Sequence, residues 1–291
     1  MTWTTTRNPD AFEAAAGEFL RARPVAHTVL LSVASSLRTL GPDAYGDDAP
    51  AFGWWRPDGQ QETAAAFLWT PPRPVLLSPM PDDAAAALAD VLACERPRPP
   101  GVNGCRTAAE AFAAAWRRQH GGTLRTASRR RLYRLAELTP PHPAPPGAAR
   151  TATPADRELL LDWFAAFAAE VGGPPPRDTR ALDDRIADGR CLLWEDRGRP
   201  VSMAGITRTL AGTARVTPVH TPPELRGRGF AGAVTAAVSA AARSAGAREV
   251  VLFTDLANAT SNALYQRLGY RAVEDHVVLE YDTEETAGRG M

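Results

Sequence analysis

Five prolines in nine residues interrupt this chain of 291 residues at Thr139 to Gly147, which reads TPPHPAPPG. Proline fixes the backbone angle φ and has no amide hydrogen, so this segment cannot form a helix or a central strand. It is predicted to be an extended linker, and the chain is long enough for a folded domain on each side of it. We place the boundary near residue 145, with domains at 1–138 and 150–282, a linker at 139–149 and a flexible tail at 283–291.

Charge and composition exclude several classes of protein. The 33 basic residues are all arginine, 33 acidic residues balance them, and neither side of the linker is strongly basic. Neither nucleic acid nor a membrane surface is therefore an expected partner. The absence of lysine excludes a Schiff base or a P-loop lysine.

The cysteines and the termini bear on the compartment. Cys94, Cys105 and Cys191 are odd in number, far apart and without a zinc-binding spacing, so we expect a reducing cytoplasm and no metal site. The N-terminus shows no signal-peptide pattern, and no apolar run has the length of a membrane span.

The second half contains a readable order of elements. A short polar strand near Arg150 runs into two helices, followed by three strands, a helix, a buried strand, a second helix and a last strand or strand pair. Thr153 is predicted to cap the first helix, with Pro154 at its first position. The predicted ranges, in chain order, are 154–171, 178–188, 191–195, 201–210, 213–221, 229–244, 249–254, 258–268 and 271–281.

The first half shows the same order of helices and strands, with weaker sequence signals. The predicted ranges, in chain order, are helices 10–21 and 28–40, strands 51–56, 62–70 and 75–78, helix 82–92, strand 101–103, helix 108–119 and strand 130–137. The two halves look like copies of one plan, inferred from element order and not from sequence identity.

The segment that carries chemistry is Val216 to Ala231, which reads VTPVHTPPELRGRGFA. A strand ends in a loop with prolines, and the chain enters a helix through a glycine-rich turn. Glycines allow close backbone approach to a ligand, and the free amides of a first helical turn attract phosphate. Arg226 and Arg228 add cationic charge. The alternative is a solvated basic loop at a helix start.

A dinucleotide-binding motif is an alternative interpretation of the same residues. Gly227, Gly229 and Gly232 also spell GxGxxG, and Asp255 lies where a ribose-binding acid could follow. Such a fold needs its glycine turn directly after the first strand with several βα units to follow. Only about 60 residues remain here, so this alternative is disfavoured.

The loop resembles that of the GNAT superfamily of acyl-CoA-dependent N-acyltransferases. Its pyrophosphate loop has Arg or Gln, two residues, Gly, one residue, then Gly or Ala, which Arg226, Gly229 and Ala231 match in order. The resemblance spans about Arg150 to Asp282. It implies two GNAT-like α/β domains of the α+β type, each a mixed, mostly antiparallel sheet flanked by helices.

A second motif lies at the distance the resemblance requires. Family members carry Asn and Tyr on the helix after the fifth strand, and Asn258, Asn262 and Tyr265 fall on one helix face. Asn258 as a helix cap and Tyr265 as a packing residue are the structural alternatives. The resemblance implies an acetyl-CoA site that comprises Val219, Thr221, Arg226, Gly227, Arg228, Gly229, Phe230, Ala231, Asn258 and Asn262.

The resemblance also implies a mechanism. The strand ending at Thr221 would splay from strand 249–254 and hold the thioester by its main chain, and a backbone amide near Val219 or His220 would stabilise the oxyanion. A primary amine would attack directly, and Tyr265 would act as general acid toward the sulfur. Glu170, Glu195 and His220 are candidates for the general base, each more readily explained as a structural or solvated residue.

The first half is expected not to bind acetyl-CoA. Its counterpart of the loop, Ser78 to Asp83, has two carboxylates where an anion needs donors. The chain is then a tandem acyltransferase with a degenerate first half.

Two further readings stay open. A catalytically silent module that senses acyl-CoA or binds a partner is the non-enzymatic alternative. For an enzyme, the acceptor fits a small amine, an amino acid, an antibiotic or a protein N-terminus, and the acyl group is acetyl by default or longer.

Overall fold

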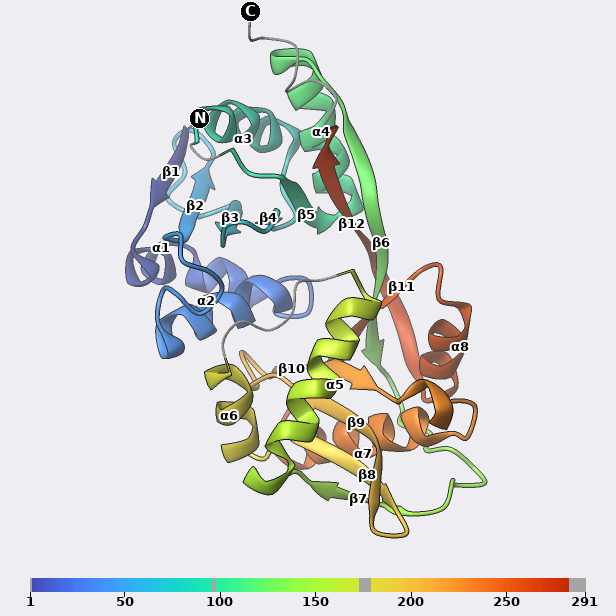
Figure 1. Ribbon diagram of the computed structural model, residues 1–291. Coiled ribbons are helices and arrows are strands. Elements are labelled where there is room, and N and C mark those ends of the chain that lie inside the picture. The colour runs from blue at the N-terminus through green and yellow to red at the C-terminus, as the bar shows by residue number, and fades with distance from the viewer. Residues whose placement is uncertain (1, 96–97, 173–178, 283–291) are drawn as a thin grey trace, which may run out of the picture. The chain divides into compact units, whose positions relative to one another are not determined.

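The computed structural model describes residues 2–95, 98–172 and 179–282 and divides into two compact units (Figure 1). Unit 1 consists of Met1–Arg131 and Glu274–Met291, and unit 2 consists of Leu132–Val273. The predicted tail at 283–291 lies outside the described residues.

Unit 1 is a mixed sheet with helices on both faces. Its elements are β1 (Thr2–Thr6), α1 (Pro9–Ala22), α2 (Thr28–Leu40), β2 (Ala51–Arg56), β3 (Ala65–Trp69), β4 (Val75–Leu77), α3 (Asp82–Cys94), β5 (Gly101–Cys105), α4 (Arg106–His120) and the first part of β6 (Leu124–Leu135). Helices α3 and α4 pack on one face, around Phe67 and Phe112. Phe12 of α1 stacks on Phe52 on the other face, with ring centroids 5.1 Å apart.

Unit 2 repeats this order of elements. They are β7 (Ala148–Thr151), η1 (Pro154–Asp156), α5 (Arg157–Glu170), α6 (Arg180–Ala187), β8 (Cys191–Asp196), β9 (Arg199–Ile206), β10 (Thr213–His220), η2 (Pro223–Leu225), α7 (Phe230–Ser244), β11 (Glu249–Asp255), α8 (Ala259–Arg267) and the first part of β12 (Tyr270–Tyr281). In each unit one pair of neighbouring strands is parallel, β4 with β5 and β10 with β11, and the other described registers are antiparallel. The predicted fold class is confirmed.

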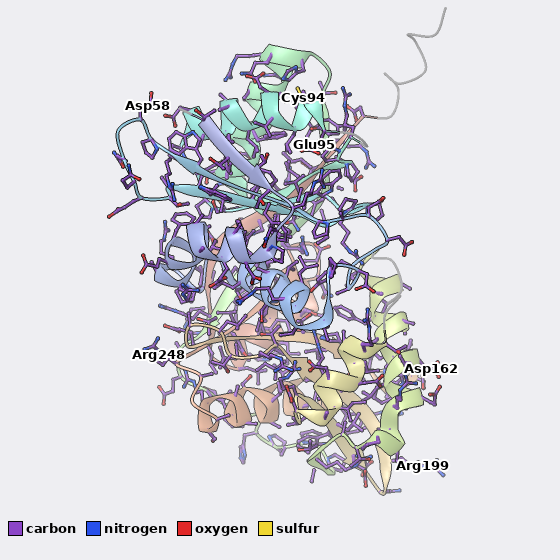
Figure 2. The ribbon with its side chains drawn as sticks, turned by 90° about the vertical axis from the view of Figure 1, so that its left-hand side faces the viewer. Asp58, Cys94, Glu95, Asp162, Arg199 and Arg248 are labelled. Atoms are coloured by element: carbon purple, nitrogen blue, oxygen red, sulfur yellow. The ribbon has the colours of Figure 1, made fainter. Side chains whose placement is uncertain are left out.

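The sheet of unit 2 separates two apolar layers. Val250 and Leu252 of β11 pack with Val234 of α7 in one layer. On the other face Leu193 and Met203 pack with residues of α5 and α6. Polar residues such as Asp162 on α5 and Arg199 at the start of β9 lie outside these layers and are exposed (Figure 2).

The unit boundaries differ from the predicted ones because terminal strands are exchanged. Residues 276–280 of β12 pair with β5 of unit 1, although they end the half that was predicted as one domain. Residues 132–135 of β6, in turn, belong to unit 2, where β6 neighbours β11. Element order does not show which of two similar sheets a final strand joins, since both offer an open edge.

The proline-rich segment is part of unit 2 and not a free linker. Pro146 accepts a hydrogen bond from Nε1 of Trp194 at 2.8 Å. Pro145 lies beside Gly229, where an added Cβ would be 3.7 Å from the ring, and β7 begins at Ala148 within the range expected for the linker. The segment lacks helix and strand up to Ala148, as proline requires.

The start of the second helical region follows its sequence signals. Thr153 and Asp156 form a capping box, in which the Asp156 carboxylate accepts from the Thr153 amide at 2.8 Å. Pro154 occupies the first position of the short helix η1. The predicted cap is confirmed.

Gly269 is expected to tolerate no side chain. It follows α8 with φ +95°, and an added Cβ would lie 1.7 Å from the carbonyl oxygen of Glu137. Gly246 follows α7 with φ +93°, but no described atom lies within 4 Å of its Cβ position. Gly246→Ala should therefore cost only the left-handed conformation, about 1–2 kcal/mol, and Gly269→Ala about 1–3 kcal/mol more.

Thermal unfolding of the two glycine variants measures this difference. Gly269→Ala should melt well below Gly246→Ala. Equal melting temperatures would contradict the close approach of Gly269 to Glu137.

Candidate functional site

The two parallel strands of unit 2 part at their carboxyl ends. Strand β10 pairs with β11 only from Thr213 to Arg215, opposite Glu249 to Val251. Beyond this point β10 continues to His220 along β9, with an irregular register between Val216 and Val219. The ends of the parallel strands thus diverge where a bound chain could pair with free backbone groups.

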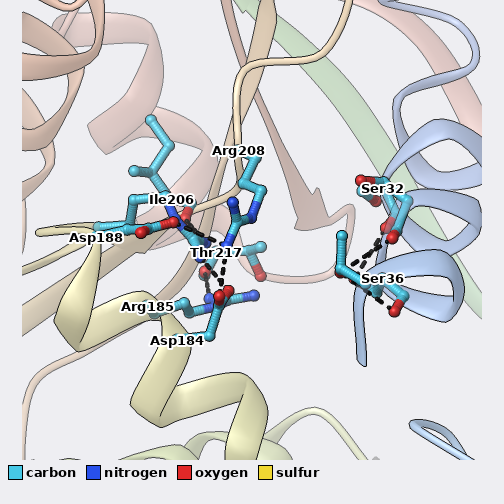
Figure 3. A network of polar contacts seen from close by, with 11 residues as sticks. Ser32, Ser36, Asp184, Arg185, Asp188, Ile206, Arg208 and Thr217 are labelled. Carbon is cyan, nitrogen blue, oxygen red and sulfur yellow. Dashed lines mark hydrogen bonds and ion pairs between the residues drawn. The ribbon is translucent and has the colours of Figure 1, made fainter. Parts of the chain in front are cut away.

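A polar network fixes the irregular part of β10. Arg185 of α6 donates from Nη1 to the carbonyl of Thr217 at 2.6 Å, and Asp184 beside it accepts from Arg208 (Figure 3). Asp184 also pairs with Arg190. Arg185 thereby fixes the Thr217 carbonyl within the irregular part of β10.

The loop that follows is open and its helix is uncapped. Residues Arg226 to Gly229 are exposed, and no described atom lies within 4 Å of the Cβ position of Gly227. No side chain caps α7, and its first turn contains no acidic residue. The amides that open a helix lack partners within it, so Phe230 and Ala231 begin a turn that can bind an anion.

Gly229 needs its residue type for this turn. It has φ +85° at the position before α7, a left-handed conformation that favours glycine. Gly227 is left-handed as well, with φ +76°. Two such glycines turn the backbone so that successive amides can face one ligand.

Arg226 is already engaged by two groups of unit 2. Its Nε donates to the carbonyl of Thr221 at 2.9 Å, and Nη2 bonds to Oε1 of Glu170, the last residue of α5. Arg228 makes a weaker contact from Nη2 to the carbonyl of Glu224 at 3.4 Å. Arg226 therefore links the loop to α5.

His220 lies next to this pair. Its Nδ1 is 3.8 Å from the same Oε1 of Glu170, too long for a hydrogen bond. The side chain is buried beside the ring of Trp163, and Nδ1 has no hydrogen-bond partner among the described residues. Burial lowers the pKa of His220; Glu170 and Glu224 oppose this and Arg226 adds to it.

Ser202 supports the end of β10 and was not predicted. Its Oγ donates to the His220 carbonyl at 3.0 Å and lies 2.8 Å from Oγ1 of Thr221. The signal was available, since Ser202 is a lone hydroxyl in the apolar strand VSMAGI. A buried hydroxyl needs a partner, and this one orders the backbone near Thr221.

The two asparagines of α8 bond within the protein. Asn258 caps the helix, accepting from the Ser261 amide at 2.9 Å, as its structural alternative expected. Asn262 donates to the carbonyl of Asp255 at 2.8 Å and accepts from the hydroxyl of Tyr133 at 2.9 Å. Tyr133 was not foreseen, because it lies in β6, far away in the sequence.

Tyr265 is buried on α8, and its hydroxyl makes no hydrogen bond within the described part of the chain. It is 8% exposed and packs edge-on against Tyr270, with ring centroids 6.0 Å apart. Among the residues that the structure describes, no hydrogen-bond partner faces its hydroxyl, whereas Tyr270 has Ser239 at 2.7 Å. Burial raises the pKa of Tyr265 to about 12.

Glu195 is held in a different cluster. Its carboxylate bonds to Nε of Arg150, which also binds Asp156 at 2.7 Å. This ion pair ties β7 to β8 and to η1. Of the three candidates for the base, only Glu170 and His220 are brought together.

The counterpart in unit 1 lacks these features. Asp82 and Asp83 lie in the first turn of α3, and Pro81 precedes it without an amide hydrogen. A Cβ at Gly104 would lie 3.0 Å from that of Leu77, so β5 stays close against β4 past their paired residues. Unit 1 therefore has neither the diverging strands nor the basic loop of unit 2.

The described residues contain neither a candidate metal cluster nor a candidate membrane span. No group of three or more His, Cys, Asp or Glu side chains among them is arranged to hold a metal ion. None of their helices combines the length and apolar character needed to cross a membrane.

Comparisons with known proteins agree with this architecture. Solved structures with the same fold include a GNAT acetyltransferase from Colwellia psychrerythraea (13% identity, 97% of this chain and 99% of that chain, TM-score 0.60). A GCN5-related N-acetyltransferase from Sphaerobacter thermophilus is also similar (21% identity, 95% and 94%, TM-score 0.60). A tandem GNAT protein from the clavulanic acid biosynthesis pathway has 13% identity, 96% and 98% coverage and a TM-score of 0.59.

The sequence comparisons locate the family in unit 2. A search of curated proteins found no match. The model of the acetyltransferase (GNAT) family matches residues 157–270, which contain the diverging strands, the loop and α8. Residues 157–270 therefore match the acetyltransferase (GNAT) family, and the chain shares its fold with a tandem GNAT protein.

Proposed function

We propose that this protein transfers an acetyl group from acetyl-CoA to a primary amine, using unit 2. The GNAT fold supports acyl transfer in general. The observation that carries the specific proposal is the exposed, uncapped loop of Arg226 to Gly229 beside the point where β10 leaves β11. Unit 1, with carboxylates at the equivalent helix start, is the degenerate half.

The loop residues would bind the diphosphate of CoA. Amides of residues 227–231 and the guanidinium groups of Arg226 and Arg228 supply donors and positive charge. Backbone groups of Val219 and Thr221, on the part of β10 that has left β11, would hold the pantetheine arm. Acetyl-CoA supplies the acyl group as an activated thioester. The chain itself therefore has to orient the substrates, stabilise the oxyanion and transfer protons.

Tyr265 would serve the leaving sulfur. With a pKa of about 12 its hydroxyl stays protonated and can donate a hydrogen bond to the sulfur. Full proton transfer to a thiolate with a thiol pKa near 8.5 is uphill by about 5 kcal/mol. We therefore propose a relay in which Tyr265 gives its proton to sulfur as it gains one from the reacting nitrogen.

Calorimetry and a thiol-release assay with a panel of amines test the proposal. We expect acetyl-CoA to bind once per chain and free thiol to appear faster when a suitable amine is added. Binding without amine-dependent release from any of small amines, amino acids, aminoglycosides and peptide N-termini would favour the silent sensing module. No binding would refute both.

A further inference from the structure

Three ionisable side chains of unit 2 meet where α5, β10 and the loop converge. Glu170 ends α5, His220 ends β10, and Arg226 begins the glycine-rich turn. Oε1 of Glu170 bonds to Nη2 of Arg226 and is 3.8 Å from Nδ1 of His220. One carboxylate oxygen thus faces two possible donors and bonds to only one of them.

The contact between Glu170 and Arg226 is easily exchanged. Their side chains are 44% and 48% exposed, and ion pairs of this exposure contribute little to stability. A diphosphate carries more negative charge than one carboxylate, so it attracts the guanidinium more strongly. A diphosphate at the loop should therefore draw Arg226 away from Glu170.

The carboxylate released in this way has one buried donor nearby. Nδ1 of His220 has no other partner among the described residues, and a movement of about 1 Å would bring it within hydrogen-bond distance of Oε1. Glu170 lies at the exposed end of its helix, where such a movement meets little resistance. If Glu170 accepts a hydrogen bond from Nδ1–H, the proton of the neutral ring stays on Nδ1 and the lone pair lies on Nε2.

We propose that Glu170 exchanges its hydrogen-bond partner, from Arg226 to His220, when a diphosphate binds at the loop. His220 then takes a proton from the ammonium form of the substrate amine. This inference rests on the proposed function and adds its regulation: the base is prepared only after the acyl donor binds. Glu170 is the positioning residue, and His220 is the residue that touches the acceptor.

The proton and electron count of the step balances. The ammonium gives one proton to Nε2 of His220, and the neutral amine forms the new C–N bond as the C–S bond breaks and its electron pair stays on sulfur. The nitrogen gives its second proton to the Tyr265 oxygen while Tyr265 protonates the sulfur. His220 then releases its proton to solvent, which accounts for the one proton that the reaction liberates.

The charges that face His220 predict how its pKa responds. Arg226 lowers the pKa in the free protein, whereas Glu170 and Glu224 raise it. Neutralising Arg226 and bringing Glu170 closer should both raise it. The added phosphate charge also raises it, so a variant is needed to isolate the contribution of Glu170.

Titration of the histidine resonances by NMR, with CoA as the probe, tests the exchange. The His220 signal is assigned by its loss in His220→Gln. In the unmodified protein we expect saturating CoA to raise the His220 pKa by about one unit or more. Glu170→Gln should reduce this rise by at least half, and Glu224→Gln, which removes the other carboxylate near the ring, should retain most of it.

Calorimetry of CoA binding to the same variants supplies a second readout. Glu170→Gln should tighten CoA binding several-fold, because Arg226 no longer has to leave a carboxylate, and more than Glu224→Gln does. An unchanged pKa rise in Glu170→Gln, with CoA bound, would overturn the exchange and leave the acetyl-CoA site intact. No CoA binding to the unmodified protein would instead refute the proposed function, and the exchange with it.

Discussion

Replacement of Tyr265 by phenylalanine is expected to lower turnover about 10²- to 10⁴-fold, the usual contribution of a positioned proton donor. Affinity for acetyl-CoA should stay within about twofold, because the hydroxyl acts on sulfur only as the thioester breaks. Stability should hardly change, since among the described residues the hydroxyl has no partner to lose. Steady-state kinetics with calorimetry and thermal unfolding separate these effects.

Tyr270→Phe is the matched control for this variant. It removes the hydroxyl that lies 2.7 Å from Oγ of Ser239 in the same apolar layer. Loss of a buried hydrogen bond should cost about 1 kcal/mol of stability with turnover nearly unchanged. Equal turnover for Tyr265→Phe and the unmodified protein would remove Tyr265 from the mechanism.

The pH profile gives an independent check on Tyr265. A group that acts in its protonated form fails only as the pH rises through its pKa, and burial raises that of Tyr265 to about 12. Activity should therefore show no alkaline decline from this residue below about pH 11. A decline that begins near pH 9 and disappears in Tyr265→Phe would contradict the burial of the hydroxyl.

Arg226→Ala is expected to weaken acetyl-CoA binding about 10- to 100-fold, the equivalent of one charge-assisted hydrogen bond of about 1.5–3 kcal/mol. In the free protein the substitution also removes the hydrogen bond from Arg226 to Glu170. Turnover at saturating donor should fall less than affinity. Calorimetric titration with acetyl-CoA measures the effect directly.

Arg248→Ala controls for the loss of one positive charge. Arg248 is exposed before β11 and donates to the carbonyl of Ala211 at 3.2 Å (Figure 2). It has no role in the proposed site, so acetyl-CoA affinity should change by less than about twofold. Equal effects of both substitutions would mean that the loop does not bind the diphosphate.

Much of unit 2 was predictable because its signals are local. Proline and threonine fixed the start of the helical region at Thr153, and glycine marked the ends of α7 and α8. The apolar run of β11 identified a strand buried on both faces. Residues adjacent in the sequence were enough to predict the basic loop. Its exposure follows from the polarity of these residues.

The features that were missed depend on contacts between distant residues. Strand β1, Thr2–Thr6, reads TWTTT and buries only Trp3, so alternation gives almost no signal. The exchange of β6 and β12 depends on which sheet edge each strand reaches. Glu170 and Arg226 form a contact although they are 56 positions apart in the sequence, and no motif contains both of them.

A crystal structure of the protein with acetyl-CoA would show directly whether the loop binds the diphosphate. We expect the diphosphate on the amides of residues 227–231 with Arg226 turned toward it, and the thioester between the diverging ends of β10 and β11 near Tyr265. Acetyl-CoA bound elsewhere, or a loop that remains empty at millimolar ligand, would contradict this expectation.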